Sequence, residues 1–131
     1  MAIELDDDPA RIDIAAVHDY LANESYWAAG RPYEVVERLV REAQRVVGVY
    51  DGERQVGFAR AFTDGVSLVY LADVYVLPQY RGQGVGLRLI REMVENGPYA
   101  QLRWVLHTRD AHGLYRKVGF VAPSERVMEK N

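Results

Sequence analysis

The spacing of apolar residues predicts helices in the first third of the chain. A short apolar stretch at Ile3–Leu5 predicts a strand, and Asp13 then precedes a helical stripe made of Ile14, Val17 and Leu21. Because Asp is a favoured N-cap residue, we expect this helix to run to about Asn23. Pro32 is suited to the start of a second helix, whose inward face carries Val35, Val36, Leu39, Val40 and Ala43.

Strand patterns dominate the middle of the chain. Residues 45–51 and 54–63 predict two strands joined by a tight hairpin at Asp51-Gly52. Asp64-Gly65 turns the chain again, into a long strand over Ser67–Leu77. This strand is dominated by aliphatic and β-branched residues, as is typical of a strand covered on both faces, so we expect it at the centre of the sheet.

The last third begins with a helix whose face carries Gly86, Leu89, Ile90, Met93 and Val94, and Gly97-Pro98 ends it. We then expect a strand over residues 102–108, a short helix over about 109–118 and a last strand near Arg126–Glu129. The predicted order is β-α-α-β-β-β-α-β-α-β(-β), within a single domain that spans residues 1–131. A final edge strand after Phe120 could support a homodimer.

Composition and charge narrow the classes of function. With 49% hydrophobic and 27% charged residues, the 131-residue chain has the balance of an ordinary globular domain. Its net charge of -3 supplies no basic field for a phosphate backbone, so we expect no nucleic-acid partner. No apolar run approaches the roughly 20 residues that span a bilayer. The N-terminal segment is also too acidic for a secretory leader, so we expect no membrane partner and a cytoplasmic location.

Cysteine and histidine usage restricts the chemistry further. The chain has no cysteine, which excludes disulfides, thiolate metal sites and a cysteine nucleophile. Its three histidines are scattered, so we expect no metal. His18 and His107 suit structural or exposed positions, whereas His112 could share a helix face with Tyr115 and contact a cofactor.

The glycine-rich turn V-L-P-Q-Y-R-G-Q-G-V-G, residues 76–86, joins the predicted central strand to a helix. Glycines at 82, 84 and 86 let the backbone turn sharply and expose successive N–H groups. The positive end of the helix dipole also favours an anion, and a pyrophosphate suits such a turn. A plain strand-to-helix turn tolerates glycines equally. The run fits neither the P-loop nor the dinucleotide fingerprint.

The same turn resembles the acetyl-CoA signature of the GNAT superfamily of N-acetyltransferases, R/Q-x-x-G-x-G/A, with Arg81, Gly84 and Gly86 at its positions. Residues 108–120 are similar to the second signature of the family, although Thr108 stands where many members have Asn. The resemblance implies an α/β (α+β) fold with a mixed, mostly antiparallel central sheet flanked by helices. It implies that acetyl-CoA is bound by Val74, Val76, Arg81, Gly82, Gln83, Gly84, Val85, Gly86, Leu87, Thr108 and Ala111.

The resemblance also implies an activity, the transfer of an acetyl group from acetyl-CoA to a primary amine of a small molecule or peptide by direct attack. Tyr115 matches the position of the general acid of the family, and a packing role is the alternative. Two other functions stay open: a catalytically silent CoA-binding sensor or interaction module, and an acyltransferase that uses another acyl-CoA.

Candidate acceptor contacts come from two places. Asp73 is the one carboxylate in the predicted central strand. It could act as a general base, as an anchor for the amine, or as a structural residue that accepts hydrogen bonds from neighbouring backbone or from Arg60. The irregular segment around residues 25–32 offers aromatic and charged groups that suit an amine, and packing is the alternative for its aromatic residues. We expect the acceptor to contact Glu24, Tyr26, Trp27 and Arg31.

Overall fold

Five strands form one sheet in the order β1-β2-β3-β4-β5, antiparallel except for the parallel pair β4 and β5. The computed structural model describes residues 2–131. The strands are β1 (Ile3–Asp6), β2 (Arg45–Asp51), β3 (Arg54–Thr63), β4 (Leu68–Val76) and β5 (Arg103–Val105). The helices are α1 (Ile14–Glu24), α2 (Tyr33–Glu42), α3 (Val85–Glu95) and α4 (His112–Arg116), with 3-10 turns at Pro9–Arg11 and Pro78–Tyr80.

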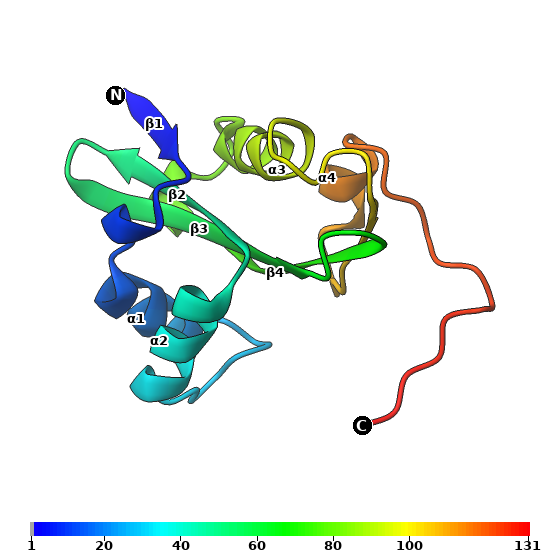
Figure 1. The fold of residues 1–131 in the computed structure, drawn as a ribbon. Helices are drawn as coiled ribbons and strands as arrows, with labels where there is room; N and C mark the ends of the chain where they lie inside the picture. The colour runs from blue at the N-terminus through cyan, green and yellow to red at the C-terminus, as the bar shows by residue number, and fades with distance from the viewer. Residues whose placement is uncertain (1) are drawn as a thin grey trace.

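Helices α1 and α2 cover one face of the sheet and α3 the other (Figure 1). The predicted fold class is confirmed.

Most elements were predicted correctly from local sequence signals such as caps, apolar spacing and turn residues. Asp13 caps α1, since its side chain accepts a hydrogen bond from Ala16 N at 3.0 Å. The predicted stripe faces inward, with Val17 and Leu21 buried. Gly52 takes a positive φ of 62° in the hairpin between β2 and β3, as the Asp-Gly signal requires.

Two apolar layers hold the sheet, one on each face. The layer under α3 includes Val47, Val49, Leu71, Leu89, Ile90 and Met93. The layer under α1 and α2 includes Val17, Leu21, Val36, Val40, Phe58 and Tyr75. Each fully buried side chain of this size contributes roughly 1.5–3 kcal/mol, so these two layers supply the main driving force for folding.

The prediction that residues 67–77 form the centre of the sheet is wrong. Strand β3 occupies the middle of the order, and β4 is next to the short edge strand β5. Burial along β4 alternates through most of its length, and β5 pairs only with residues 68–70. The rest of β4 therefore has one edge without a neighbouring strand, and a cleft lies beside it.

The predicted last strand at Arg126–Glu129 is also wrong. In the part of the chain that the structure describes, no strand follows β5, and residues 121–131 are exposed. Val127 and Met128 have the right residue type for a strand, but no apolar layer covers them. The edge strand that could have supported a homodimer is therefore absent, and β5 and α4 are shorter than predicted.

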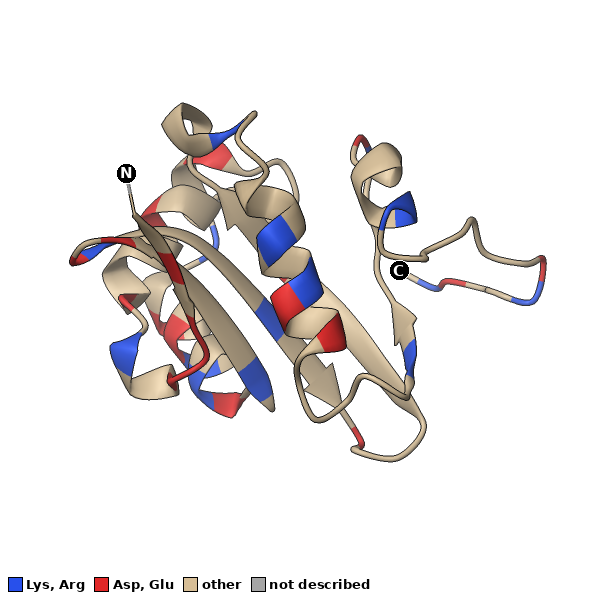
Figure 2. Cartoon of the chain, turned by 90° about the horizontal axis from the view of Figure 1, so that it is seen from above, with Lys and Arg blue, Asp and Glu red and all other residues tan. Residues whose placement is uncertain are grey.

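Ion pairs connect acidic residues of the N-terminal segment, residues 4–7, to Arg11 and to Arg45 of β2. Arg11 Nη1 lies 2.6 Å from Glu4 and 3.1 Å from Asp6, and Arg45 Nη1 lies 2.7 Å from Asp7. Figure 2 shows acidic residues gathered on β1 and the turn after it, whereas α3 carries both signs of charge. None of the helices in residues 2–131 has the length and apolar character needed to cross a membrane.

Candidate active site

The turn between β4 and α3 has the backbone geometry of an anion site. Gly82 and Gly84 take φ values of 76° and 79°, in the left-handed region that favours glycine. The first intrahelical hydrogen bond of α3 runs from Arg88 N to Gly84 O at 3.1 Å. The amides that precede Arg88 therefore lie at the positive end of the helix without an intrahelical acceptor, which suits a phosphate.

The side chain of Arg81 braces this turn from within the protein. Its Nε donates to Val76 O at 2.9 Å, and its Nη2 donates to the hydroxyl of Tyr20 at 2.8 Å. Tyr20 in turn stacks on Tyr75 of β4, with ring centroids 4.0 Å apart. The guanidinium thus ties the end of β4 to α1, and the contribution of Tyr20 was not predicted from the sequence.

A β-bulge interrupts β4 in front of this turn. The register with β3 shifts so that Asp73 and Val74 lie opposite the single residue Ala59, and Asp73 takes a positive φ of 55°. Beside the bulge, β4 and the chain after β5 enclose a cleft of about 340 Å³. This cleft collects eight of the predicted site residues, Tyr26, Trp27, Arg31, Asp73, Val74, Thr108, Ala111 and Tyr115.

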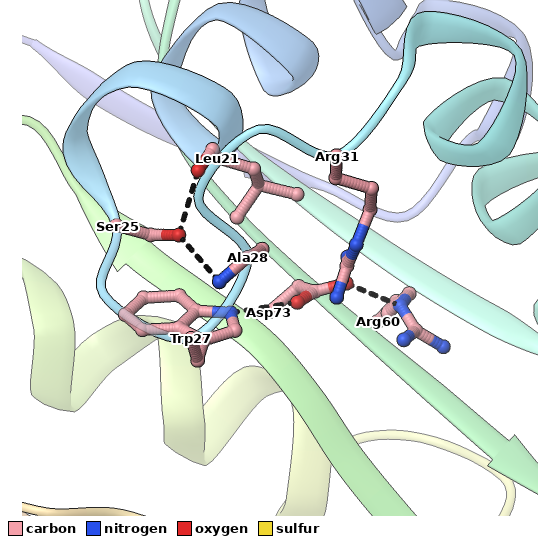
Figure 3. Close-up of polar contacts among 7 residues, drawn as sticks. All are labelled: Leu21, Ser25, Trp27, Ala28, Arg31, Arg60 and Asp73. Carbon is pink, nitrogen blue, oxygen red and sulfur yellow. Dashed lines mark hydrogen bonds and ion pairs between the residues drawn. The ribbon is translucent and has the colours of Figure 1, made fainter.

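The carboxylate of Asp73 links three side chains of the cleft wall. Its carboxylate accepts hydrogen bonds from Trp27 Nε1 at 2.7 Å, Arg31 Nη1 at 2.9 Å and Arg60 Nε at 2.7 Å (Figure 3). Burial raises the pKa of Asp73, but the opposing effects of Arg60, Arg31 and Trp27 together hold it below its usual value. Three donors around a carboxylate leave it with little basicity.

The same contacts shape the segment between α1 and α2. Ser25 Oγ donates to Leu21 O at 2.7 Å and accepts from Ala28 N at 3.0 Å, which folds the chain into a tight turn after α1 (Figure 3). That turn presents Trp27 to Asp73, so the predicted substrate segment is anchored to the sheet by side-chain hydrogen bonds.

Tyr115 lies in α4 at the other side of the cleft. It is only 8% exposed, and its ring packs edge-on against Phe120 at 5.7 Å. Burial, with smaller effects of Tyr26 and Asp110, raises the pKa of Tyr115 to about 12. The hydroxyl is therefore protonated throughout the physiological range.

Thr108 and Tyr26 organise the chain between β5 and α4. Thr108 Oγ1 accepts a hydrogen bond from Ala111 N at 3.1 Å, next to the start of α4. The hydroxyl of Tyr26 accepts from Arg109 N at 2.9 Å, and the Arg109 guanidinium lies 3.8 Å from the centre of the Tyr26 ring. Tyr26 thereby joins the α1–α2 segment to the far wall of the cleft.

Comparison with known proteins decides the family. A family model described as "Acetyltransferase (GNAT) domain" matches residues 42–122. The chain belongs to the GNAT acetyltransferase family. It is an enzyme, an acetyl-CoA-dependent N-acyltransferase, and the predicted family is confirmed.

Relatives extend this likeness beyond the matched region. The crystal structure of a GNAT-family protein from Xanthomonas campestris pv. campestris is 33% identical, has a TM-score of 0.93, and covers 100% of this chain and 94% of that one. Peptidyl-lysine N-acetyltransferase YjaB of Salmonella typhimurium is 29% identical over 84% of this chain and 70% of its own. Thialysine N-epsilon-acetyltransferase of Mus musculus is 59% identical over 27 residues, 21% of this chain and 16% of its own.

The residues of this acetyltransferase fit the cofactor that its family uses. At Gly82 and Gly84 an added Cβ would meet no atom within 4 Å, so the outer side of the turn is open. The turn adjoins Val76 at the end of β4, and β4 leads back to the bulge at Val74. The predicted cofactor residues therefore form a continuous path from the start of α3 to the cleft.

Glu24 departs from the predicted site. It lines a separate cleft of about 460 Å³ on the α1 side of the sheet, together with Asp13, Asp19 and Tyr20. Conversely, Arg60, Tyr70 and His107 line the active-site cleft of the acetyltransferase without having been predicted there. Arg60 lies on β3 and Tyr70 on β4, and they line one cleft beside the part of β4 that β5 does not pair with. Within residues 2–131, no group of three or more His, Cys, Asp and Glu side chains is placed to hold a metal.

Proposed function

We propose that this enzyme transfers the acetyl group of acetyl-CoA to a primary amine by direct attack of the amine nitrogen on the thioester carbonyl. One observation carries the proposal: the open amides at the start of α3 and the cleft that contains Tyr115 lie along the same strand, β4. A cofactor with a pyrophosphate at one end and a thioester at the other suits that arrangement.

The pyrophosphate would bind the amides between Gly82 and Leu87. Hydrogen bonds to a charged group contribute roughly 1.5–3 kcal/mol each, so a few of them anchor the cofactor without a metal. The bulge at Asp73 and Val74 leaves main-chain polar groups outside the regular ladder with β3, where they can contact the extended arm of the cofactor.

Tyr115 would protonate the departing thiolate. Its raised pKa keeps the proton in place until the sulfur becomes basic, although full transfer to a thiolate of ordinary pKa is then about 5 kcal/mol uphill. The transfer therefore has to be coupled to bond cleavage. Asp73 would act as a positioning residue that holds Trp27 and Arg31 in the acceptor wall, since its lowered pKa suits a base poorly.

The acceptor would be an amine at the end of a flexible linear chain. Two relatives carry names that specify peptidyl-lysine and thialysine, whose reacting groups are of this kind. Trp27 in the cleft wall offers an aromatic face that attracts a cationic chain, whereas the ring of Tyr26 is already covered by the Arg109 guanidinium.

The test is a thiol-release assay with acetyl-CoA against lysine peptides, free lysine, thialysine, polyamines and aminoglycosides, with propionyl-CoA and succinyl-CoA as other donors. Because the chain has no cysteine, the protein adds no thiol background. We expect release with acetyl-CoA and a linear amine. Binding of acetyl-CoA in calorimetry without release for any amine would instead favour a silent CoA-binding module.

A further inference from the structure

Two residues that line the cleft are connected by hydrogen bonds to a third outside it, and the proposed function does not use this connection. The hydroxyl of Tyr70, on β4, is hydrogen-bonded to Nδ1 of His107, just after β5. Nε2 of His107 lies 3.0 Å from a carboxylate oxygen of Glu129, in the C-terminal segment. Tyr70 and His107 both line the cleft that contains Asp73 and Tyr115.

The hydrogen-bond partners assign a direction to this chain of groups. A neutral imidazole has one donor nitrogen and one acceptor nitrogen. The carboxylate of Glu129 can only accept, so Nε2 of His107 carries the hydrogen. Nδ1 is then the acceptor, and the Tyr70 hydroxyl donates to it. The lone pairs of the Tyr70 oxygen are left to accept a proton from a group in the cleft.

The acetyl transfer needs such an acceptor, because an alkylammonium group has no lone pair for attack. Asp73 is occupied by three donors, and Tyr115 is protonated. Asp110, the other carboxylate that lines the cleft, is exposed. Of the side chains that line the cleft, the imidazole of His107 is the type best suited to accept a proton and pass it on.

We propose that Tyr70, His107 and Glu129 form a proton relay that deprotonates the acceptor amine. The ammonium proton moves to the Tyr70 oxygen as the Tyr70 proton moves to Nδ1 of His107. The electron pair of the broken N–H bond stays on the amine nitrogen and forms the bond to the acyl carbon. This assignment rests on the proposed function.

The protons balance over the whole reaction. The ammonium loses two protons as it becomes the amide. One leaves through the relay to water, which His107 reaches because its side chain is 54% exposed. The other replaces the proton that Tyr115 gives to the thiolate. In this scheme Tyr70 is the catalytic residue, His107 receives the proton through it, and Glu129 positions the imidazole and stabilises its charged form.

The surroundings of Tyr70 suit a relay better than a free phenolate base. Burial raises the pKa of Tyr70, and the charges of Glu129 and Asp73 act in the same direction. Arg60 opposes them, but the net shift is upward. The ring stacks on Phe62 at a centroid distance of 5.0 Å. Tyr70 thus keeps its own proton and is held in one orientation, as concerted transfer requires.

The test compares kcat and kcat/KM for the amine across pH in wild type and in His107→Gln, which can keep hydrogen bonds but cannot take up a proton. We expect kcat/KM to fall about 100-fold near neutral pH and the loss to shrink at high pH, where the free amine is abundant. Acetyl-CoA affinity and melting temperature should stay at wild-type values. Tyr70→Phe should cause a similar loss, and Glu129→Gln a smaller one of about 10-fold.

Two further variants separate a relay from a structural link. Added imidazole should restore activity to His107→Gly, because it can occupy the vacated position and accept the proton. His18 packs against Tyr33 away from the cleft, so the His18→Gln variant should behave as wild type.

A His107→Gln enzyme with unchanged rates would overturn the relay, and so would a uniform loss of activity at every pH without imidazole rescue. So would loss of the pH dependence in Asp110→Asn alone. A wild-type protein without turnover for any amine overturns both proposals, whereas an active wild type with an inert His107 overturns only the relay.

Discussion

At the scale of single residues, the glycines of the β4–α3 turn have different tasks. Gly84 takes a φ of 79° as the N-cap of α3, where other residues are strained. Gly86 lies inside the helix, and a Cβ there would meet Leu114 at an ordinary 3.7 Å. The signature glycine at 84 is therefore required by the backbone, whereas the backbone at 86 would accept a Cβ.

Gly84→Ala should lower the free energy of unfolding by about 1–2 kcal/mol, the usual cost of a left-handed residue with a Cβ. It should also weaken CoA binding in calorimetry, because the amides of the turn shift. Gly65→Ala is the matched control: its φ is also 79°, it too has no atom within 4 Å of the added Cβ, and it lies between β3 and β4. Equal losses of CoA affinity in both variants would contradict a specific role of the turn.

Tyr115→Phe should lower kcat about 100-fold and leave acetyl-CoA affinity nearly unchanged, since only the donated proton is lost. Because burial raises the pKa of Tyr115 to about 12, the wild-type rate should not fall between pH 8 and about 10 through loss of this proton. Tyr33→Phe, on the exposed face of α2, serves as the control. Unchanged turnover in Tyr115→Phe would assign the tyrosine to packing.

At the scale of elements, Asp73 joins three parts of the fold. It lies on β4, pairs with Arg60 of β3, and holds Trp27 and Arg31 of the segment between α1 and α2. The Asp73 side chain is only 3% exposed, so its loss would leave two guanidinium groups without their carboxylate. The segment between α1 and α2 is therefore held to the sheet through a single buried charge.

Asp73→Asn should lower the free energy of unfolding at pH 7 by about 3–5 kcal/mol, the usual cost of breaking a buried ion pair. The pKa of Asp73 is lower in the folded than in the unfolded chain, so its contribution is complete above about pH 4. This stabilising contribution is lost as the pH falls through the pKa that Asp73 has in the folded chain. The difference in unfolding free energy between Asp73→Asn and wild type should therefore become smaller at low pH. Urea unfolding at pH 7 and pH 3 measures this; a constant gap would exclude the charge as its cause. Asp19→Asn, an exposed residue, should change stability by less than about 0.5 kcal/mol.

Tyr50 on strand β2 allows a second test of how a buried polar group affects stability. The Tyr50 hydroxyl is buried and has no hydrogen-bond partner among the residues that the structure describes. Tyr50→Phe should therefore raise the free energy of unfolding by about 1–2 kcal/mol in urea titrations. In contrast, Tyr80 donates to Asp51 at 2.6 Å, so Tyr80→Phe should lower it by about 1 kcal/mol. Destabilisation by both changes would mean that Tyr50 has a partner, such as a buried water.

At the scale of the whole molecule, the C-terminal segment contributes little burial. Residues 121–131 are exposed, and Val121 and Met128 are 84% and 92% accessible. Figure 1 shows this segment leaving α4 and running outside the layers of sheet and helices. Its contact with the site is through Glu129 and His107.

Truncation after Phe120 should leave the melting temperature nearly unchanged in calorimetry, because almost no apolar surface is lost. Turnover should fall about as far as in Glu129→Gln, since both remove the same carboxylate. A large drop in melting temperature would show that the segment packs against the rest of the protein. Phe120→Ala is the contrasting variant, because Phe120 packs against Tyr115 and its loss should lower the melting temperature.

Much of the architecture could be predicted because its signals are local. The cap at Asp13, the Asp51-Gly52 hairpin and the glycine turn before α3 depend on neighbours in the chain, and all three were placed correctly. The position of β4 in the sheet and the fate of residues 126–129 depend on which strand finds a partner. Residue type does not specify that, and both predictions failed.

The sequence by itself determined the family, the order of the main elements and the glycine turn before α3, because each depends on contiguous residues whose backbone preferences are intrinsic. Tertiary structure alone decided the cleft. Its walls come from the α1–α2 segment, the middle of β3 and β4, and the chain around His107 and Tyr115. They meet because the pairing of β5 with β4 ends at Tyr70 and Val105, and this separation of the chain after β5 from the rest of β4 lies beside the bulge at Asp73. Such a separation arises from the hydrogen-bond register between distant segments, which no local pattern encodes.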